Sequence, residues 1–325
     1  MRLAHLRYFA LLLGVVAGGS FAQGAYPGKP LRMVVTFTPG GAADFTARIV
    51  AEKWSELWQQ QVVVENRIGA GGSIGAEAVQ KAPADGYTLL LVASAHAFNA
   101  ALYPNLSFDL LKDFVPLGLA TSTPMALAVN PRMAVADLKE FTALLQARPH
   151  QVQYATCGVA TAHHFAMELY KFQTRTDALH VPYRGCAPAV VDAVGGQIDV
   201  VMSSLTTVLP QARAGKLRTL AITSGNRSAS APDIPTFRES GVPALKDYAV
   251  EVYYGLMVRT GTPPDIAPRL EADLRRVIAM PDVAQRIAKA GIDPFPKSAQ
   301  EMAAIMSADV ARFREVIRQA GIRPE

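Results

Sequence analysis

The chain alternates between short apolar stretches and longer stretches in which apolar residues recur at every third or fourth position. Residues 31–37, 61–65 and 87–93 are short runs with many β-branched residues, which predicts buried strands. Residues 44–60 carry an apolar stripe at helical spacing, which predicts a helix with one face in the core. The stripe consists of Phe45, Ile49, Val50, Trp54, Leu57 and Trp58. Strands that alternate with helices in this way predict an α/β fold with mostly parallel sheets flanked by helices.

The alternation continues through the rest of the chain. Residues 114–121 and 125–130 predict two strands separated by Pro124, where we expect the chain to cross between two domains. Residues 248–258 predict a strand that returns to the first domain. Amphipathic helices are predicted near the C-terminus at residues 264–279, 282–290 and 299–321.

The first predicted strand leads into a glycine turn and a helix start. The strand breaks at Pro39-Gly40-Gly41, and we expect both glycines to adopt positive φ, with Asp44 as the N-cap of the helix. Free N–H groups and the helix dipole at such a turn favour an anion. A plain strand-to-helix turn is the alternative. The candidate ligand contacts here are Thr38, Gly40, Gly41, Ala42 and Ala43.

A second copy of this arrangement lies in the other half of the chain. A short strand at residues 152–155 leads to residues 156–161, and a helix begins near residue 162. We therefore expect two similar domains that face each other across a ligand cleft. The first comprises residues 23–123 and 248–325, and the second residues 124–247. The candidate contacts here are Thr156, Cys157, Gly158, Thr161 and His164.

Polar residues also follow other predicted strands at their carboxyl ends, where open α/β sheets bind ligands. Ser94, His96 and Asn99 follow the strand at residues 87–93. The remaining candidates are Tyr183 and Arg184, before a helix predicted at 188–194, and Ser203, after a strand at 197–202. Arg184 could instead form a surface ion pair, and His164 could pack at a helix start.

A glycine-rich stretch at residues 66–75 resembles a dinucleotide-binding fingerprint, but its spacing is GxGxxxG rather than GxGxxG. We therefore favour a packing turn or a support for the neighbouring ligand loop, and expect no cofactor.

The N-terminus has the pattern of an export signal. Basic residues precede an apolar segment at residues 8–16, and Ser20-Phe21-Ala22 matches a cleavage site, so the mature chain would begin at Gln23. We expect a soluble periplasmic protein without a lipid anchor; a buried N-terminal helix is the alternative. Without Arg2 and Arg7, 30 basic residues face 27 acidic ones, a net charge of +3. No basic run suggests nucleic acid.

Catalytic chemistry finds little support in the sequence. Cys157 followed by His163 or His164 could be a thiol nucleophile with its base, but residues six or seven positions apart across a loop need not meet. The two histidines are adjacent and point in different directions, which disfavours a metal site. Cys157 and Cys186 could form a disulfide or remain free thiols. We expect no enzymatic activity and no metal.

Ten stretches, in order along the mature chain, together resemble the Bug-type substrate-binding receptors of tripartite tricarboxylate transporters. They are 26–32 (YPGKPLR), 38–44 (TPGGAAD), 63–67 (VVENR), 69–72 (GAGG), 84–90 (ADGYTLL), 181–185 (VPYRG), 195–199 (GGQID), 215–218 (GKLR), 234–236 (IPT) and 260–263 (TGTP). None is specific alone, but the ordered set is.

The resemblance implies a two-domain periplasmic-binding-protein clamshell that captures a small carboxylate and delivers it to a membrane permease. In relatives, the loop that matches residues 38–43 holds one carboxylate end, the loop that matches residues 156–161 opposes it, and His164 occupies the family's histidine position. The chain departs from the family pattern at residues 36–38, at Ala160 and at Ser203, where an acidic residue often stands.

Since serine cannot pair with an amine by charge, we expect a carboxylate ligand without a cationic group, an organic or aromatic mono- or dicarboxylate. We also expect a monomer. A secreted hydrolase or transferase with the same cleft, and a sensor subunit that signals to a membrane kinase, are the alternatives.

Overall fold

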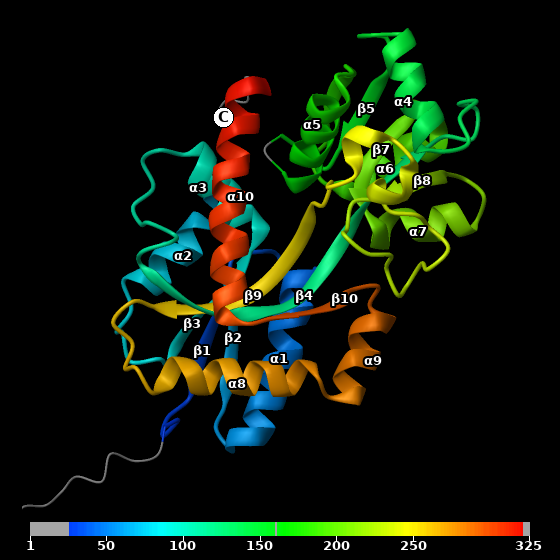
Figure 1. Cartoon of the computed structure of the whole chain (residues 1–325). Coiled ribbons are helices and arrows are strands. Elements are labelled where there is room, and N and C mark those ends of the chain that lie inside the picture. The colour runs from blue at the N-terminus through cyan, green and yellow to red at the C-terminus, as the bar shows by residue number, and fades with distance from the viewer. Residues whose placement is uncertain (1–25, 160, 321–325) are drawn as a thin grey trace, which may run out of the picture.

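The computed structural model describes residues 26–159 and 161–320. The predicted signal peptide and Ala160 lie outside these residues. Two sheets share one long strand, β4(Phe114–Val129), as Figure 1 shows. The first half of β4 pairs with β9(Glu251–Arg259), and its second half pairs with strands of the other sheet.

The first sheet has a parallel core of β1(Leu31–Val35), β2(Val62–Asn66) and β3(Thr88–Ala93), with β1 in the middle. Strand β9 joins β3 antiparallel, β4 joins β9, and β10(Asp293–Lys297) joins β4. The helices of this half are α1(Ala42–Trp58), α2(Ser73–Gln80), α3(Ser94–Leu102), α8(Ile266–Ile278), α9(Pro281–Lys289) and α10(Ala299–Ala320), with the short helix η1(Ala70–Gly72) before α2.

The second sheet repeats this plan around β5(Gln153–Thr156), which runs parallel to β6(Leu179–Pro182) and β7(Val200–Ser204). Strands β7 and β8(Arg218–Ile222) both pair antiparallel with β4. The helices are α4(Leu138–Ala147), α5(Ala162–Thr174), α6(Cys186–Gly195) and α7(Leu205–Arg213), followed by the short helices η2(Phe237–Ser240) and η3(Pro243–Leu245). The structure is thus α/β with two domains, each with a parallel core to which antiparallel strands are added near the crossover.

The prediction of two strands separated by Pro124 was wrong, because β4 is continuous. Pro124 is the last residue that pairs with β9, and Met125 is the first that pairs with β7. Proline lacks the N–H needed within a ladder, but here it stands where the strand changes partners. The same residue therefore marks the crossover that the sequence predicted.

An aromatic cluster joins the two domains behind the strands. Phe313 of α10 contacts Phe98 of α3, with ring centroids 5.5 Å apart, and Phe165 of α5, at 4.2 Å. All three rings are buried. Figure 1 shows α10 standing beside α3 with its C-terminal end near α5. The C-terminal helix thus packs on the helices that begin at the site described next.

Candidate ligand-binding site

A cleft of about 530 Å³ lies where the two domains face each other. The first domain contributes residues 36–38 after β1, four residues of the glycine-rich stretch, residues 93–95 at the start of α3, and Asn99 and Tyr103. The second domain contributes Cys157, Val159 and residues 161–163 at the start of α5. Val252 and Tyr254 of β9 complete the lining. The carboxyl ends of β1, β3 and β5 therefore meet at one place, as expected for an open α/β sheet.

The N-terminus of helix α3 lies at this cleft. No side chain caps it at Ala93. Ser94, the first residue of the helix, is only 2% exposed, and its Oγ has no hydrogen-bond partner among the described residues. The first N–H groups of a helix have no partner within the helix and carry partial positive charge. The start of α3 is therefore suited to an anion.

His96 and Asn99 hold this part of the wall from different positions. His96 is buried and does not line the cleft; its Nδ1 accepts the N–H of Ala93, and its Nε2 lies 3.2 Å from Oγ1 of Thr36. Burial lowers the pKa of His96 to about 4, so the ring is neutral at pH 7. Asn99 lines the cleft and donates to the carbonyl of Gly71.

The glycine-rich stretch belongs to the cleft wall as well. Gly72 adopts φ +101°, and a Cβ there would lie 3.0 Å from Nε2 of His96. Glycine is therefore required for the close packing of this turn on the β1 and α3 residues. The expectation of a packing turn beside the ligand loop agrees with this arrangement.

The turn after β1 differs in detail from the prediction. Helix α1 begins at Ala42 with Gly41 as its N-cap, so Asp44 lies in the first turn and is not the cap. Only Gly40 has positive φ, at +85°, whereas Gly41 has φ −83°. A helix that follows two glycines can begin at any of several residues. Here the Asp44 carboxylate bonds to Gly40 and Arg48 and does not act as the N-cap.

The Asp44 carboxylate accepts the N–H of Gly40 at 3.0 Å and pairs with Arg48 at 2.8 Å. Burial by itself would raise the pKa of Asp44, but the bonds from Arg48, Gly40 and Asn66 outweigh it and lower the pKa to about 2. An anion is thus already present at the N-terminus of α1. Of the predicted loop residues, Thr38 lines the cleft, while Gly40, Gly41, Ala42 and Ala43 do not. Their contact with a ligand stays a prediction.

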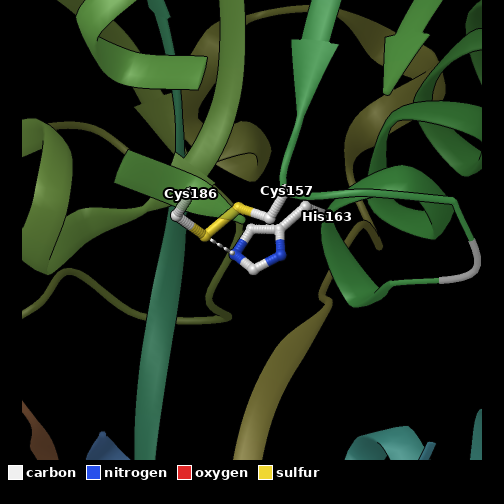
Figure 2. A group of neighbouring side chains, drawn as sticks. All are labelled: Cys157, His163 and Cys186. Carbon is white, nitrogen blue, oxygen red and sulfur yellow. Dashed lines mark hydrogen bonds between the residues drawn. A yellow bond between two sulfur atoms is a disulfide. The ribbon is translucent and has the colours of Figure 1, made fainter. Parts of the chain in front are cut away.

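The second wall is tied by a disulfide between Cys157, after β5, and Cys186, the first residue of α6 (Figure 2). The interpretation of Cys157 as a thiol nucleophile is therefore wrong, because its sulfur is bonded to Cys186. The two sulfurs and His163 lie within 4.8 Å of one another, but the bonded sulfurs provide no thiolate for a metal. The loop is braced further by Thr161, which caps α5 and donates to the carbonyl of Gly158 at 2.8 Å.

His163, and not His164, is the histidine that lines the cleft. His163 is 9% exposed; its Nε2 lies 3.0 Å from Oγ of Ser204, and its Nδ1 has no hydrogen-bond partner within the described part of the chain. Burial lowers its pKa to about 4. Sequence reasoning missed His163 as a residue that lines the cleft, because which of two adjacent helical residues faces the cleft depends on how α5 is placed.

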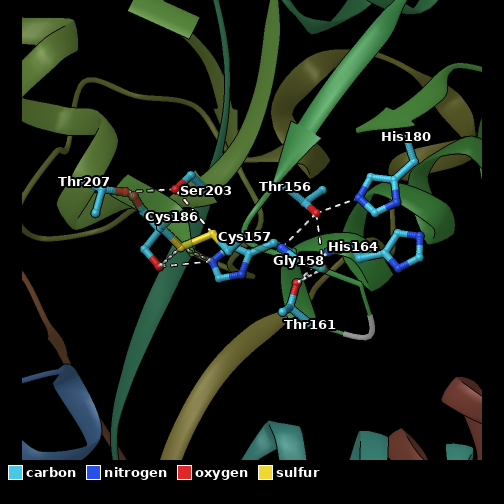
Figure 3. The surroundings of a disulfide bond; sticks show 11 residues. Thr156, Cys157, Gly158, Thr161, His164, His180, Cys186, Ser203 and Thr207 are labelled. Atoms are coloured by element: carbon cyan, nitrogen blue, oxygen red, sulfur yellow. Dashed lines mark hydrogen bonds between the residues drawn. A yellow bond between two sulfur atoms is a disulfide. The ribbon is translucent and has the colours of Figure 1, made fainter. Parts of the chain in front are cut away.

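His164 lies behind the wall with two of its neighbours. Its ring stacks on His180 with centroids 4.0 Å apart, and Nε2 of His180 lies 2.7 Å from Oγ1 of the buried Thr156 (Figure 3). Burial, with a contribution from Lys171, lowers the pKa of His164 to about 4. Neither Thr156 nor His164 lines the cleft, nor does Gly158.

Three further predicted residues also lie away from the lining. Ser203 is buried and its Oγ is 2.9 Å from Oγ1 of Thr207 (Figure 3). The Tyr183 hydroxyl donates to Asp192 at 2.7 Å, and Arg184 is exposed. The predicted residues that the structure brings together at the cleft are Thr38, Ser94, Asn99, Cys157 and Thr161.

Among the described residues that line the cleft, none is Lys, Arg, Asp or Glu. The polar groups are the backbone N–H groups at the start of α3, hydroxyls, the Asn99 amide and the imidazole of His163. Phe37, Ile68, Val159 and Val252 supply apolar surface. Such a cleft can bind an acid through N–H and O–H donors, but it offers no carboxylate to an amine.

A second hollow, of about 670 Å³, lies on the second domain near the amino ends of β5 and β7. It differs from the cleft in carrying charge, from Arg132, Arg148 and Asp199. Ligands of open α/β sheets bind at the opposite, carboxyl ends of the strands. The cleft is therefore the candidate ligand-binding site.

Comparison with known proteins agrees with this architecture. Residues 46–322 match the family model described as "Tripartite tricarboxylate transporter family receptor". The chain belongs to this receptor family. Protein BugT of Bordetella pertussis is 33% identical over 323 residues, which cover 99% of this chain and 98% of BugT. The Bug-type resemblance of the sequence is thereby confirmed.

Solved structures of receptors with this fold superpose along nearly the whole chain. Rpa4515 of R. palustris, determined with adipate, matches with a TM-score of 0.77 and 30% identity over 92% of this chain and 100% of that chain. MatC (Rpa3494) of Rhodopseudomonas palustris, determined with bound malate, matches with a TM-score of 0.72 and 29% identity over 90% and 100%. BugD, described as a periplasmic binding protein, matches with a TM-score of 0.72 and 30% identity over 92% of this chain and 100% of that chain. Within residues 26–159 and 161–320, no helix is long and apolar enough to cross a membrane.

Proposed function

We propose that this protein is a periplasmic receptor that captures a small carboxylate without a cationic group and delivers it to a tripartite tricarboxylate-type membrane transporter. The observation that carries the proposal is the cleft itself, in which helices α3 and α5 of opposite domains both begin and no described lining residue is charged. The proposal adds the ligand class and the transporter partner to the family membership.

The donors at the cleft are sufficient for an acid. Backbone N–H groups at a helix start, together with the hydroxyls of Ser94 and Thr38, can surround a carboxylate. Hydrogen bonds to a charged group each contribute about 1.5–3 kcal/mol. These bonds act together with burial of the apolar part of the acid to offset the cost of association.

The ligand class follows from what the wall offers. A zwitterionic amino acid would bring an ammonium group into a cleft whose described lining holds no carboxylate, which carries a large desolvation cost. The apolar side chains of Phe37, Ile68 and Val159 favour an aliphatic or aromatic body. The adipate and malate in two structures of relatives are acids of this kind, without an amine.

We further infer that the domains, residues 23–123 with 248–325 and residues 124–247, close on the ligand by bending at β4 and β9. These strands carry the chain between the two sheets. Closure would bury the acid and form the surface that a permease recognises. Small-angle scattering of the monomer should show compaction upon saturation, and an unchanged profile would contradict closure.

A thermal-shift screen of residues 23–325 tests the function. The panel contains adipate, malate, citrate, benzoate, an aromatic dicarboxylate, glutamate and aspartate. A ligand at about 100 times its dissociation constant stabilises the native state by about 2.7 kcal/mol. We expect a shift with one or more of the non-amino acids, and recovery of the acid unchanged by chromatography. A shift with glutamate or aspartate alone, or consumption of the compound, would contradict the proposal, the latter in favour of a secreted enzyme.

A further inference from the structure

The imidazole of His163 is held in a particular way in the cleft wall. It lies in the first turn of α5, and Figure 2 shows its ring beside the disulfide. Nε2 lies 3.0 Å from Oγ of Ser204 and 3.8 Å from Sγ of Cys186. These contacts from β7 and α6 engage one ring nitrogen, Nε2, and leave the other, Nδ1, for another partner.

That partner is missing from the described residues. Nδ1 is buried and makes no hydrogen bond within them, although the side chain lines the cleft. A buried polar atom without a partner is unfavourable, and a ligand at this position would supply the partner. Ser94 presents the same feature from the first domain, so each domain offers one unsatisfied side-chain group to the cleft.

The surroundings of His163 supply no charge of their own. Cys157 and Cys186 are joined in the disulfide, and Ser204 is neutral. The nearest titratable neighbour along α5, His164, faces His180 and lies 3.8 Å from Glu168, away from the cleft. Burial alone accounts for the lowered pKa of His163, about 4 in the empty cleft. A bound carboxylate would therefore be the one charge that this ring faces among the described groups.

We propose that His163 is a specificity-determining contact whose Nδ1 pairs with a carboxyl group of the bound acid, and that binding takes up a proton onto this imidazole. The proposal rests on the proposed function, since it requires a carboxylate ligand. A carboxylate at hydrogen-bond distance favours the imidazolium and opposes the effect of burial. The proton comes from solvent, and Ser204 can accept from Nε2 of the charged ring as readily as it contacts the neutral one.

The direction of the pH effect follows from this linkage. The pKa of His163 is higher with the acid bound than in the empty cleft, so affinity rises as pH falls through the bound-state pKa. The rise ends where the acid itself becomes protonated, near its ordinary pKa of about 4. Protonation of the ligand in place of His163 would also take up a proton, so the test must observe the imidazole directly.

Calorimetry and NMR together make the test. The probes are adipate, malate and benzoate, titrated into the wild type and His163→Asn at about pH 6 in buffers of different ionisation enthalpy. Asparagine keeps an amide near the position of Nδ1 but cannot titrate. We expect uptake of a substantial fraction of about one proton by the wild type and none by H163N, with binding of H163N about tenfold weaker at pH 6 and similar at pH 8. His164→Asn, which alters the stacked histidine behind the wall, is the control and should retain proton uptake.

Imidazole ¹⁵N shifts of the wild type provide a readout that does not depend on the variant folding. We expect the His163 shifts to move toward the imidazolium values upon addition of the binding acid. Binding with unchanged His163 shifts, or proton uptake equal in H163N, would overturn the inference and leave the proposed function intact. Failure of the wild type to bind any of the non-amino acids of the thermal-shift panel, which includes these probes, would overturn both, and is distinguished because it occurs before any substitution.

Discussion

The hydroxyl of Ser204, at the end of β7, lies 3.0 Å from Nε2 of His163, in the first turn of α5. This contact joins a strand end to a helix start within one domain. It holds the imidazole at the cleft with its other nitrogen free of described partners. A hydrogen bond to one ring nitrogen of a histidine fixes the orientation of the ring and therefore the direction in which the other nitrogen can bind a partner.

Ser204→Ala removes the partner of Nε2 and leaves a second buried nitrogen unsatisfied. We expect the free energy of unfolding to fall by about 1–2 kcal/mol and ligand affinity to fall about fivefold, because the ring loses its fixed position. Urea unfolding and calorimetry measure the two effects. Thr207→Val removes hydrogen bonds to Ser203 and to the Ser204 carbonyl without touching His163, so it should reduce stability alone. Equal affinity losses in both variants would contradict this role for Ser204.

Ser94→Ala should separate stability from binding. The unpaired, buried Oγ is unfavourable in the empty protein, so its removal should raise the free energy of unfolding by about 1 kcal/mol. The same change removes a donor for the acid and should weaken binding about fivefold to tenfold. Thr219→Val, which removes another unpaired buried hydroxyl on β8 outside the cleft, is the matched control. We expect Thr219→Val to raise the free energy of unfolding and to leave ligand affinity unchanged. If Ser94→Ala likewise leaves ligand affinity unchanged, Ser94 does not contact the ligand.

Reduction of the disulfide should destabilise the protein. Cys157 and Cys186 are 29 positions apart, and opening a loop of this length costs about 3–4 kcal/mol of the free energy of unfolding. Affinity should fall as well, because Cys157 and Thr161 belong to the loop that the bond restrains. Urea unfolding with and without a thiol reductant measures the change. The double variant Cys157→Ala with Cys186→Ala should unfold at the same urea concentration as the reduced wild type, with or without reductant. A wild-type unfolding curve that does not change upon addition of reductant would contradict the prediction.

Asp44 should contribute a pH-dependent part of stability. Its folded pKa of about 2 lies below its unfolded value of about 4, so the contribution is present above pH 4 and is lost as pH falls toward 2. We expect Asp44→Asn to lower the free energy of unfolding by about 2 kcal/mol at pH 7, with the two curves converging near pH 2. Asp247→Asn, at a side chain 84% exposed, should have no such effect. A constant difference between wild type and D44N at all pH values would contradict this linkage.

Local pattern was sufficient for much of the fold. The stripe from Phe45 to Trp58 predicted α1, and the short apolar runs predicted β1 and β3, because core-facing positions repeat with the period of their element. Pairing between distant strands was not accessible in the same way. Residues 114–129 form one strand because β9, β7 and β8 pair along it. The sequence around Pro124 does not indicate which strands these partners are.

The position of the cleft was predicted more accurately than the side chains that line it. Ser94 and Asn99 reach the cleft because they follow a buried strand, as the position of ligands in α/β sheets predicts. His96 lies between them in sequence but turns behind the wall, and His163 replaces His164 at the lining. These differences arise because the rotation of each helix about its axis decides which side chains face the cleft. The disulfide arises because Cys157 and Cys186 come close together in the fold. Both depend on tertiary packing, which spacing along the chain does not determine.

A crystal structure of residues 23–325 with the acid that gives the largest thermal shift tests the central claim most directly. The account predicts density for the intact acid between the starts of α3 and α5, with carboxylate oxygens within hydrogen-bond distance of Ser94 and of Nδ1 of His163. Density for the acid in the hollow beside Arg132 and Arg148, with the cleft holding only water, would contradict the claim that this cleft is the receptor's binding site.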